Sequence, residues 1–289
     1  MTPALLTLAR RALTGEARMA RGSAVVAAVR GGPDSMALLH VLARLAPTLG
    51  IVVHAHGVDH GLRPAAVNEL DTAEAFAKRL GVPFGRSTVR LARGGNLQAR
   101  ARAARYAALA DAARAIGAPA IATAHHADDR AETVLLRLMR GAGPRGLAVL
   151  PPRAPLAASG IELVRPLVRA RRGAVMAHLE RHGVPFATDP SNEDPRYLRT
   201  RVRRELMPLL QELSPGIVDH LVALADQLAS EEAGQASDFP LPRSTQTALT
   251  ELMRSRSTTA RVWLPGGLVV TVDSRARPVG GAGSASGTA

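Results

Sequence analysis

Between residues 23 and 140, short apolar runs alternate with longer stretches in which apolar side chains recur at helical spacing. The short runs predict β-strands, and the stretches between them predict amphipathic helices. The expected strands are residues 24–29, 51–55, 82–89 and 120–123, and the expected helices are residues 36–45, 66–80 and 97–116. Strands that alternate with helices in this way predict an α/β fold, a Rossmann-like parallel sheet with helices on both faces.

The pattern changes after residue 140, where residues 141–160 become rich in Gly and Pro and predict a connection. Apolar spacing then predicts helices near 171–182, 195–212 and 215–230, a short helix near 245–255, and a strand pair over 261–274 that turns at Gly266-Gly267. The expected organisation is an α/β domain over residues 1–150, a linker over 151–168, a small helical domain over 169–230, a linker over 231–244, a short α+β C-terminal region over 245–279 and a disordered tail over 280–289.

Composition narrows the class of protein. The hydrophobic content of 46% supports a core, and because aromatic residues supply only 2%, that core must consist mainly of Ala, Val and Leu. The chain has no cysteine, which excludes disulfides, thiolate zinc sites and thiol catalysis and fits a reducing cytoplasm. No apolar run approaches the ~20 residues that span a bilayer, so no membrane partner is expected.

The net charge of +13 predicts an anionic partner, and nucleic acid fits best. Lys78 is the only lysine, so 36 of the 37 basic residues (37 − 1) are arginine. A GC-rich codon bias would explain arginine in place of lysine, but it would not explain 13 unbalanced positive charges. Arginine also suits phosphate, which it binds through a planar fork of donors.

The sequence AAVRGGPDSMALL (27–39) places two glycines between an expected strand and an expected helix. Gly31 and Gly32 let the backbone turn so that amides at the start of the helix can bind phosphate. The loop lacks the lysine of the Walker pattern and does not match the dinucleotide pattern G-x-G-x-x-G. Asp34 suits Mg²⁺, and Ser35 suits a helix cap or a phosphate oxygen. A tight turn with Asp34-Ser35 as a simple N-cap is the alternative.

A second polar stretch, ATAHHADDRAETVLLRLMRG (122–141), follows the last of these expected strands. A helix that starts near Asp129 places Asp129, Glu132 and Thr133 on one face. The residues before it are of types found at metal sites (His125, His126 and Asp128). Adjacent histidines have poor spacing for structural zinc, so carboxylates that hold Mg²⁺ near a nucleotide or receive an amine fit better. Acidic residues placed to suit the helix dipole are the alternative.

The loop AVRGGPDSMALL resembles the SGGxDS loop of the N-type ATP pyrophosphatases, the PP-loop family, which cleave ATP between the α and β phosphates. Within that family the chain resembles the tRNA(Ile)-lysidine synthetases. The further matching segments are GVDHGLRPAA (57–66), GNLQARARAARYAALADAA (95–113), AHHADDRAETVLLRLMRG (124–141) and a basic segment from VRPLVRARR to RRELMPLL (164–210). Together they cover roughly residues 22–230 in the same order, whereas the C-terminal part matches only through RVWLPGGLVV.

The resemblance implies a ligase that forms a C–N bond. ATP adenylates the C2 carbonyl oxygen of the wobble cytidine in tRNA(Ile) with a CAU anticodon, and the ε-amine of L-lysine then displaces AMP to give lysidine. Two steps lower each barrier, because AMP is a better leaving group than an amide-like oxygen. The resemblance thus implies ATP as a substrate, Mg²⁺ as a cofactor, and lysine and this tRNA as partners, and a homodimer is a further expectation.

The same resemblance assigns residues to roles. Catalysis falls to Asp34, His125, Asp129, Arg199 and Arg203. ATP binding falls to Arg30, Gly31, Gly32, Pro33, Asp34 and Ser35, and Mg²⁺ binding to Asp34 and Asp129. Lysine binding falls to Asp129 and Glu132, and tRNA binding to Arg105, Arg199, Arg203 and Arg204.

The chain departs from the family pattern in three places. Arg30 stands where the loop has serine, Thr200 and Arg204 stand where a basic helix has Asn and His, and the C-terminal region is short. Arg30 raises an alternative function, a catalytically impaired PP-loop relative that binds tRNA. A tRNA thiolase with the same loop depends on cysteines, and a glutamine-dependent amide synthetase needs an amidotransferase partner, so both fit this cysteine-free chain less well.

Overall fold

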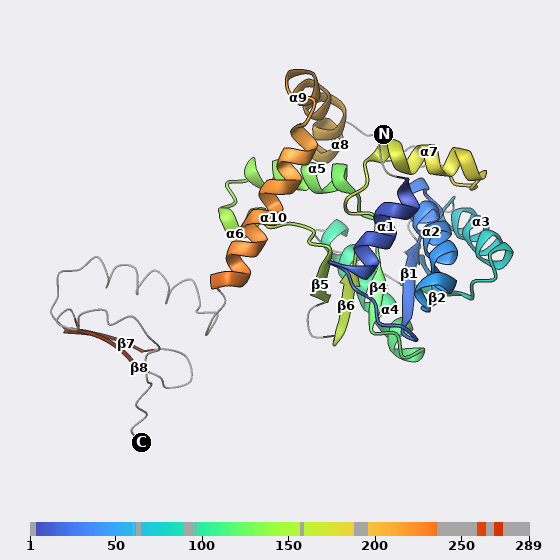
Figure 1. Cartoon of the computed structure of the whole chain (residues 1–289), viewed down its shortest axis with the longest axis horizontal. Helices are drawn as coiled ribbons and strands as arrows, with labels where there is room; N and C mark the ends of the chain where they lie inside the picture. Colours follow the sequence, from blue (N-terminus) through green and yellow to red (C-terminus); the bar gives the residue numbers. More distant parts are fainter. Residues whose placement is uncertain are drawn as a thin grey trace. The chain divides into compact units, whose positions relative to one another are not determined.

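The structure is a computed structural model that describes residues 4–59, 61, 65–89, 95, 97–156, 159–187, 196–235, 259–263 and 269–273. The chain forms two compact units, Met1–Glu232 and Ala233–Ala289 (Figure 1). In the second unit, β7 (Thr259–Trp263) and β8 (Val269–Asp273) pair antiparallel, which confirms the expected strand pair. The turn at 266–267, the helix near 245–255 and the tail over 280–289 lie outside the described residues.

The first unit is built on a six-stranded sheet with the order β3-β2-β1-β4-β6-β5. Its strands are β1 (Ala24–Val29), β2 (Val52–Asp59), β3 (Phe84–Thr88), β4 (Ala120–Ala122), β5 (Arg153–Leu156) and β6 (Ile161–Val164). Neighbouring strands run parallel except β5, which pairs antiparallel with β6. The expected α/β fold is confirmed, and the four strands that the apolar runs predicted all belong to its sheet.

The structure corrects the linker expected over residues 151–168, because β5 and β6 lie within it. Each has only four residues, and Pro155 lies within β5. Proline has no N–H to donate, but it is tolerated here because β5 is an edge strand. Across the pair, Arg153 Nε donates to Glu162 Oε1 at 2.7 Å. The Gly and Pro content of this stretch therefore concealed the edge of the sheet.

Side chains of β1 alternate between two layers of helices, as the period of a strand requires. Val25, Ala27 and Val29 face one hydrophobic core, whereas Val26 faces another. Helices of the first layer are α1 (Leu5–Thr14), α2 (Pro33–Leu49), α3 (Ala65–Arg79) and α7 (Arg172–His182), and the second layer contains α4 (Leu97–Ala115) (Figure 1). Because both faces are covered, β1 is apolar throughout.

A third hydrophobic core joins a further group of helices. They are α5 (Ala127–Leu138), α6 (Pro144–Leu147), the π-helix η2 (Val202–Leu206), α9 (Met207–Leu213) and α10 (Ile217–Gln235), and α8 (Leu198–Arg201) leads into η2 and contacts α5. Val134, Val202 and Val218 are buried in this core. The helix expected over 195–212 is thus α8, η2 and α9, and α10 continues past the expected linker boundary at residue 231. None of the helices in the described part of the chain is long and apolar enough to cross a membrane.

The helices do not separate at the expected domain boundary. α5 lies in the first expected domain but packs with α8 to α10, and α7 lies in the second but packs on the sheet through Val175 and Leu179. Arg130 of α5 is fully buried, donates from Nε to Val149 O at 2.8 Å and lies 2.6 Å from Asp226 Oδ1 of α10. A buried charge needs such pairing, so the sheet and the helical group form one unit.

Three histidines meet where α2 packs on α7. His40 Nδ1 lies 2.8 Å from His178 Nε2, and the His182 ring centroid lies 5.0 Å and 4.5 Å from those of His40 and His178. Burial, together with smaller effects of neighbouring histidines and arginines, lowers the pKa of both His40 and His178 to about 4. Both imidazoles are therefore neutral in the folded protein near pH 7.

This cluster predicts acid sensitivity. In the unfolded chain a histidine has a pKa of 6.5, whereas in the folded protein the pKa of His40 and His178 is about 4. Between these two pH values the unfolded chain binds more protons than the folded protein. The free energy of unfolding therefore falls as the pH drops from about 6.5 to about 4. His178→Gln, which keeps a polar partner for His40 but does not titrate, should flatten this fall. Chemical denaturation from pH 7 to pH 4 measures it, with the exposed His220→Gln as the control. An unchanged slope in His178→Gln would contradict the prediction.

Candidate active site

Two polar loops meet at one edge of the sheet because β1 and β4 pair in parallel, with Val25 opposite Ala120 and Ala27 opposite Ala122. β1 leads into residues 30–35, which we call the glycine loop, and then into α2. β4 leads through residues 123–126 into α5. The amino ends of α2 and α5 therefore lie together, although they are more than 90 residues apart in the chain.

Gly31 is required by both conformation and space. Its φ is +83°, and a Cβ at this position would clash with the backbone oxygen of Glu69 in α3. Gly31 O accepts a hydrogen bond from Ala187 N–H at 2.9 Å, which links the loop to the segment after α7. Gly32, in contrast, has a φ of −74° at the N-cap of α2 and no atom within 4 Å of the position of its Cβ. The loop is thus held from two sides at Gly31 and open at Gly32.

Ser35 closes the glycine loop on itself. Its Oγ donates to Gly32 O at 2.9 Å and accepts from the backbone N–H of Arg30 at 3.2 Å. Pro33 occupies the first turn of α2, where its missing N–H costs no hydrogen bond. The side chain of Arg30 is exposed, so the loop holds its shape through backbone contacts that do not depend on this side chain.

His126, which is absent from the expected site residues, begins α5. The helix starts at Ala127, two residues before the expected start at Asp129. His126 is fully buried, its Nδ1 accepts the Asp129 N–H at 3.3 Å, and Asp129 Oδ2 accepts the His126 N–H at 3.2 Å. This reciprocal cap puts the His126 proton on Nε2, which faces Asp129 Oδ2 at 3.5 Å and Asp34 Oδ1 at 3.7 Å. The three-residue spacing from His126 to Asp129 was the available signal.

Asp129 and Glu132 of α5 bind two arginines from the helical group, and we call these four residues the carboxylate–arginine network. Arg199 of α8 donates from Nε to Glu132 Oε2 at 3.2 Å and from Nη2 to Asp129 Oδ1 at 3.0 Å. Arg203 of η2 donates from Nε to Glu132 Oε1 at 2.6 Å, and from Nη2 to Glu132 Oε2 at 3.0 Å and Asp129 Oδ1 at 3.2 Å. The structure thus brings together four of the expected site residues.

The ionisation of the carboxylates follows from their surroundings. Burial tends to raise the pKa of Asp129, but His126, the charge of Arg199 and the hydrogen bond from the His126 N–H outweigh it and leave the pKa lowered. The pKa of Asp34 is raised, because burial and the negative charge of Asp129 outweigh the effect of basic neighbours, which lower it. Asp34 Oδ1 is buried and has no hydrogen-bond partner among the described residues. A cation beside Asp34 would relieve both effects.

His125 is a neutral imidazole. Burial and the positive charges of Arg165, Arg102 and Arg199 together lower its pKa to about 3, although the negative charge of Asp129 opposes the shift. Its Nδ1 lies 2.9 Å from Thr123 Oγ1. His125 therefore stands among arginines at this edge of the sheet as a donor or acceptor, not as a charge.

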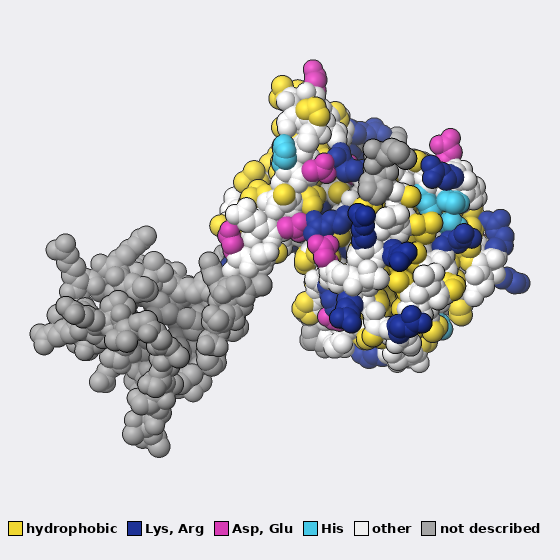
Figure 2. Space-filling model, viewed as in Figure 1, with side chains coloured by type: hydrophobic (Ala, Val, Ile, Leu, Met, Phe, Trp, Pro, Cys, Tyr) yellow, Lys and Arg dark blue, Asp and Glu magenta, His cyan; other side chains and the backbone are white. Residues whose placement is uncertain are grey.

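The remaining expected site residues are basic. Arg105 of α4 has a pKa lowered to about 10, first by burial and then by the positive charge of Arg30. Arg204 is exposed on η2. Dark-blue Lys and Arg side chains predominate over magenta Asp and Glu on the face of the first unit in Figure 2. This face of the first unit therefore attracts anions.

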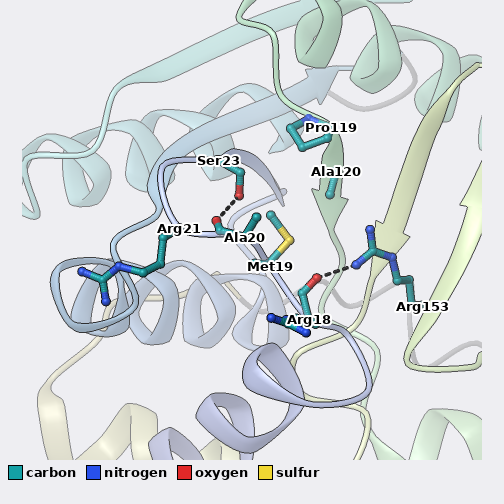
Figure 3. Close-up of a pocket in the computed structure, with 8 residues that line it drawn as sticks. All are labelled: Arg18, Met19, Ala20, Arg21, Ser23, Pro119, Ala120 and Arg153. Carbon is teal, nitrogen blue, oxygen red and sulfur yellow. Dashed lines mark hydrogen bonds between the residues drawn. The ribbon is translucent and has the colours of Figure 1, made fainter.

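A cavity of about 560 Å³ lies at the opposite end of the sheet. Ser23, just before β1, and Ala120, at the start of β4, line it together with Arg18 and Arg153 (Figure 3). Arg153 donates to the backbone oxygen of Arg18 and pairs with Glu162, so it joins the segment before β1 to the edge strands. Because it lies at the amino ends of the strands, this cavity is separate from the candidate active site.

A family model described as the PP-loop domain matches residues 6–210. The chain is 41% identical to a tRNA(Ile)-lysidine synthase of Salinispora arenicola, over 78% of this chain and 67% of that protein. The chain belongs to the tRNA(Ile)-lysidine synthase family of PP-loop proteins. The family resemblance carried by the glycine loop, the α5 stretch and the basic segment is therefore confirmed.

Other comparisons show how much of its relatives the chain covers and which fold it shares. The chain is 40% identical to a tRNA(Ile)-lysidine synthase of Symbiobacterium thermophilum and 42% identical to one of Geobacter sulfurreducens, but it spans only 48% of either protein, about half. The solved structure of a U34-tRNA thiolase, NcsA of Methanococcus maripaludis, matches with a TM-score of 0.64 over 78% of each chain at 19% identity. That match shows a shared fold.

The glycine loop predicts a contrast between its two glycines. Gly31→Ala should destabilise the protein by at least about 2 kcal/mol, because it forces an L-residue to positive φ and into the Glu69 backbone. Gly32→Ala should cost a fraction of that, since its backbone and surroundings accept a methyl group. Urea unfolding of both variants measures the difference, and equal losses of stability would contradict it.

Proposed function

We propose that this chain makes lysidine: it adenylates the wobble cytidine of a tRNA(Ile) with a CAU anticodon and transfers L-lysine to it, releasing AMP and pyrophosphate. The observation that carries the proposal is the pair of buried carboxylates, Asp129 and Glu132, held beside a glycine loop in a chain of this family. A loop for phosphates next to two carboxylates for an ammonium suits adenylation followed by attack of an amine.

The glycine loop and the amino end of α2 would bind the phosphates of ATP. Gly32 leaves the start of α2 open, and backbone amides there, together with the helix dipole, stabilise negative charge. Such fixed donors also stabilise the pyrophosphate as it leaves. His125, with Nδ1 engaged by Thr123, would use Nε2 near the α phosphate without adding charge.

Asp34 and Asp129 would hold Mg²⁺. Among the described residues, no group of three or more His, Cys, Asp and Glu side chains is arranged to bind a metal ion. Mg²⁺ often takes only one or two carboxylates and completes its shell with phosphate oxygens and water, so two carboxylates fit it. The unpartnered Oδ1 of Asp34 is the oxygen free for this role. When bound, the ion supplies positive charge to the phosphates of ATP.

The lysine ε-ammonium would bind between Asp129 and Glu132. Both side chains are acceptors, and Glu132 is 2% exposed, so water competes weakly for the ammonium. Arg199 and Arg203 now make the hydrogen bonds that the ammonium would need. Deprotonation of the ammonium would then yield the nucleophilic amine.

Charge supports RNA as the partner. The chain carries +13 and the site is surrounded by arginines, which bind phosphates bidentately. We propose a tRNA substrate and, with it, a cytoplasmic place of action. Nothing about Arg30 favours the alternative of an impaired relative, because the glycine loop uses its backbone N–H and leaves its side chain exposed.

A turnover assay tests the proposal. With ATP, Mg²⁺ and a transcript of tRNA(Ile) bearing CAU, the chain should release AMP and attach labelled lysine to the RNA. Asp34→Asn should abolish AMP release, whereas Glu132→Gln should lower lysine attachment at least about tenfold more than AMP release, because an amide does not neutralise an ammonium.

The assay has two controls, one in the protein and one in the RNA. Asp111→Asn removes an exposed carboxylate that pairs with Arg114 on α4, and it should behave as wild type. A transcript with uridine at the wobble position should be inert. AMP release that is independent of RNA, or wild-type lysine attachment by Glu132→Gln, would reject the proposed function.

A further inference from the structure

The carboxylates proposed to bind lysine already have cationic partners from within the chain. Both oxygens of Glu132 and Oδ1 of Asp129 accept hydrogen bonds from Arg199 and Arg203 at 2.6–3.2 Å. A forked guanidinium that bridges two carboxylates binds more strongly than a single ammonium. Lysine therefore competes at a disadvantage while the arginines stay in place.

The two halves of the carboxylate–arginine network differ in exposure. The side chains of Glu132 and Asp129 are 3% and 12% exposed, whereas those of Arg199 and Arg203 are 46% and 33% exposed. An anion in solution can therefore reach the arginines without first reaching the buried carboxylates. The arginines form the outer layer of the network and the carboxylates the inner one.

Charge balance links the binding of a lysine ammonium to the departure of the arginines from the carboxylates. Two arginines neutralise two carboxylates, so a lysine ammonium added to the intact network would leave a net positive charge in a largely buried place. Withdrawal of both arginines would leave the carboxylates unpaired. Phosphates that take the arginines while an ammonium takes the carboxylates keep both layers paired.

The segment that carries the arginines is lightly anchored. Within α8 and η2 only Thr200 and Val202 are buried, while Leu198 is 38% exposed. η2 is a π-helix, a conformation that often marks functional sites. Few buried contacts therefore oppose a local shift of this segment.

We propose that Arg199 and Arg203 form a latch over Asp129 and Glu132, and that RNA phosphates draw them away so that lysine binds tightly only after RNA. The proposal rests on the proposed function for the identity of lysine. Linkage requires the effect to be mutual, so lysine strengthens RNA binding by the factor by which RNA strengthens lysine binding.

Equilibrium dialysis of labelled lysine, without ATP, tests the latch directly. An RNA hairpin with the CAU anticodon loop should lower the Kd of lysine for the wild-type chain about tenfold, within the usual range of coupling between sites. Arg199→Ala and Arg203→Ala should each lower the Kd about fivefold in the absence of RNA and shrink the effect of RNA. Arg201→Ala is the matched control, because Arg201 lies between them but pairs with Glu205 on the exposed side.

RNA binding tests the latch without lysine. Glu132→Gln removes one negative charge that holds both arginines, so it should tighten binding of the same hairpin about fivefold and steepen its salt dependence. Arg199→Ala in the Glu132→Gln background should cancel the gain. Thermal unfolding of each variant checks that the first unit remains folded.

The outcomes separate the latch from the proposed function. Weaker lysine binding in the two arginine variants, or unchanged RNA affinity in Glu132→Gln, would overturn the latch, because the arginines would then be a permanent part of the pocket. Tighter RNA binding by Glu132→Gln while no variant binds lysine would uphold the latch and reject lysine as its ligand.

Discussion

The parallel pairing of β1 with β4 is the constraint from which the candidate active site follows. β4 has only three residues, yet it is paired on both sides, with β1 and with β6, and its register places its carboxyl end beside that of β1. Two helix amino ends are thereby aimed at one place. Each brings positive partial charge for a phosphate, and their first turns bring Asp34 and Asp129. A slip in this register would separate the phosphate loop from the carboxylates.

The second constraint is the charge buried on α5. Asp129, Arg130 and Glu132 lie within four residues and are all buried, which would be costly without charged partners. Arg130 is paired with Asp226 of α10, and the two carboxylates are paired with arginines of α8 and η2. The helical group therefore neutralises α5 as well as packing on it. This explains why the unit does not divide where the composition of the chain changes.

The sequence predicted those features that depend on residues close together in the chain. β1 begins and ends where the apolar run does, and the glycine loop and the carboxylates of α5 were found from spacing alone. β5 was missed because Pro155 hides an edge strand, and the cap of α5 was missed because His126 is an unusual capping residue. The family resemblance pointed to Arg199 and Arg203 but not to their partners. Those contacts join residues 67 to 74 positions apart, which no periodicity encodes.

The arginines of this chain differ in whether the structure uses their side chains. Arg203 bridges Glu132 and Asp129 with Nε and Nη2, a geometry that the single ammonium of a lysine does not reproduce. Position 203 therefore depends on the fork, whatever bias raised the arginine content. At position 30 the reverse holds. The glycine loop takes from Arg30 only a backbone N–H, which serine would supply equally, and the exposed side chain leaves the contacts between Ser35 and Gly32 undisturbed. The departure from the family pattern thus adds a positive charge that lowers the pKa of Arg105, while the backbone contacts of the loop do not depend on it.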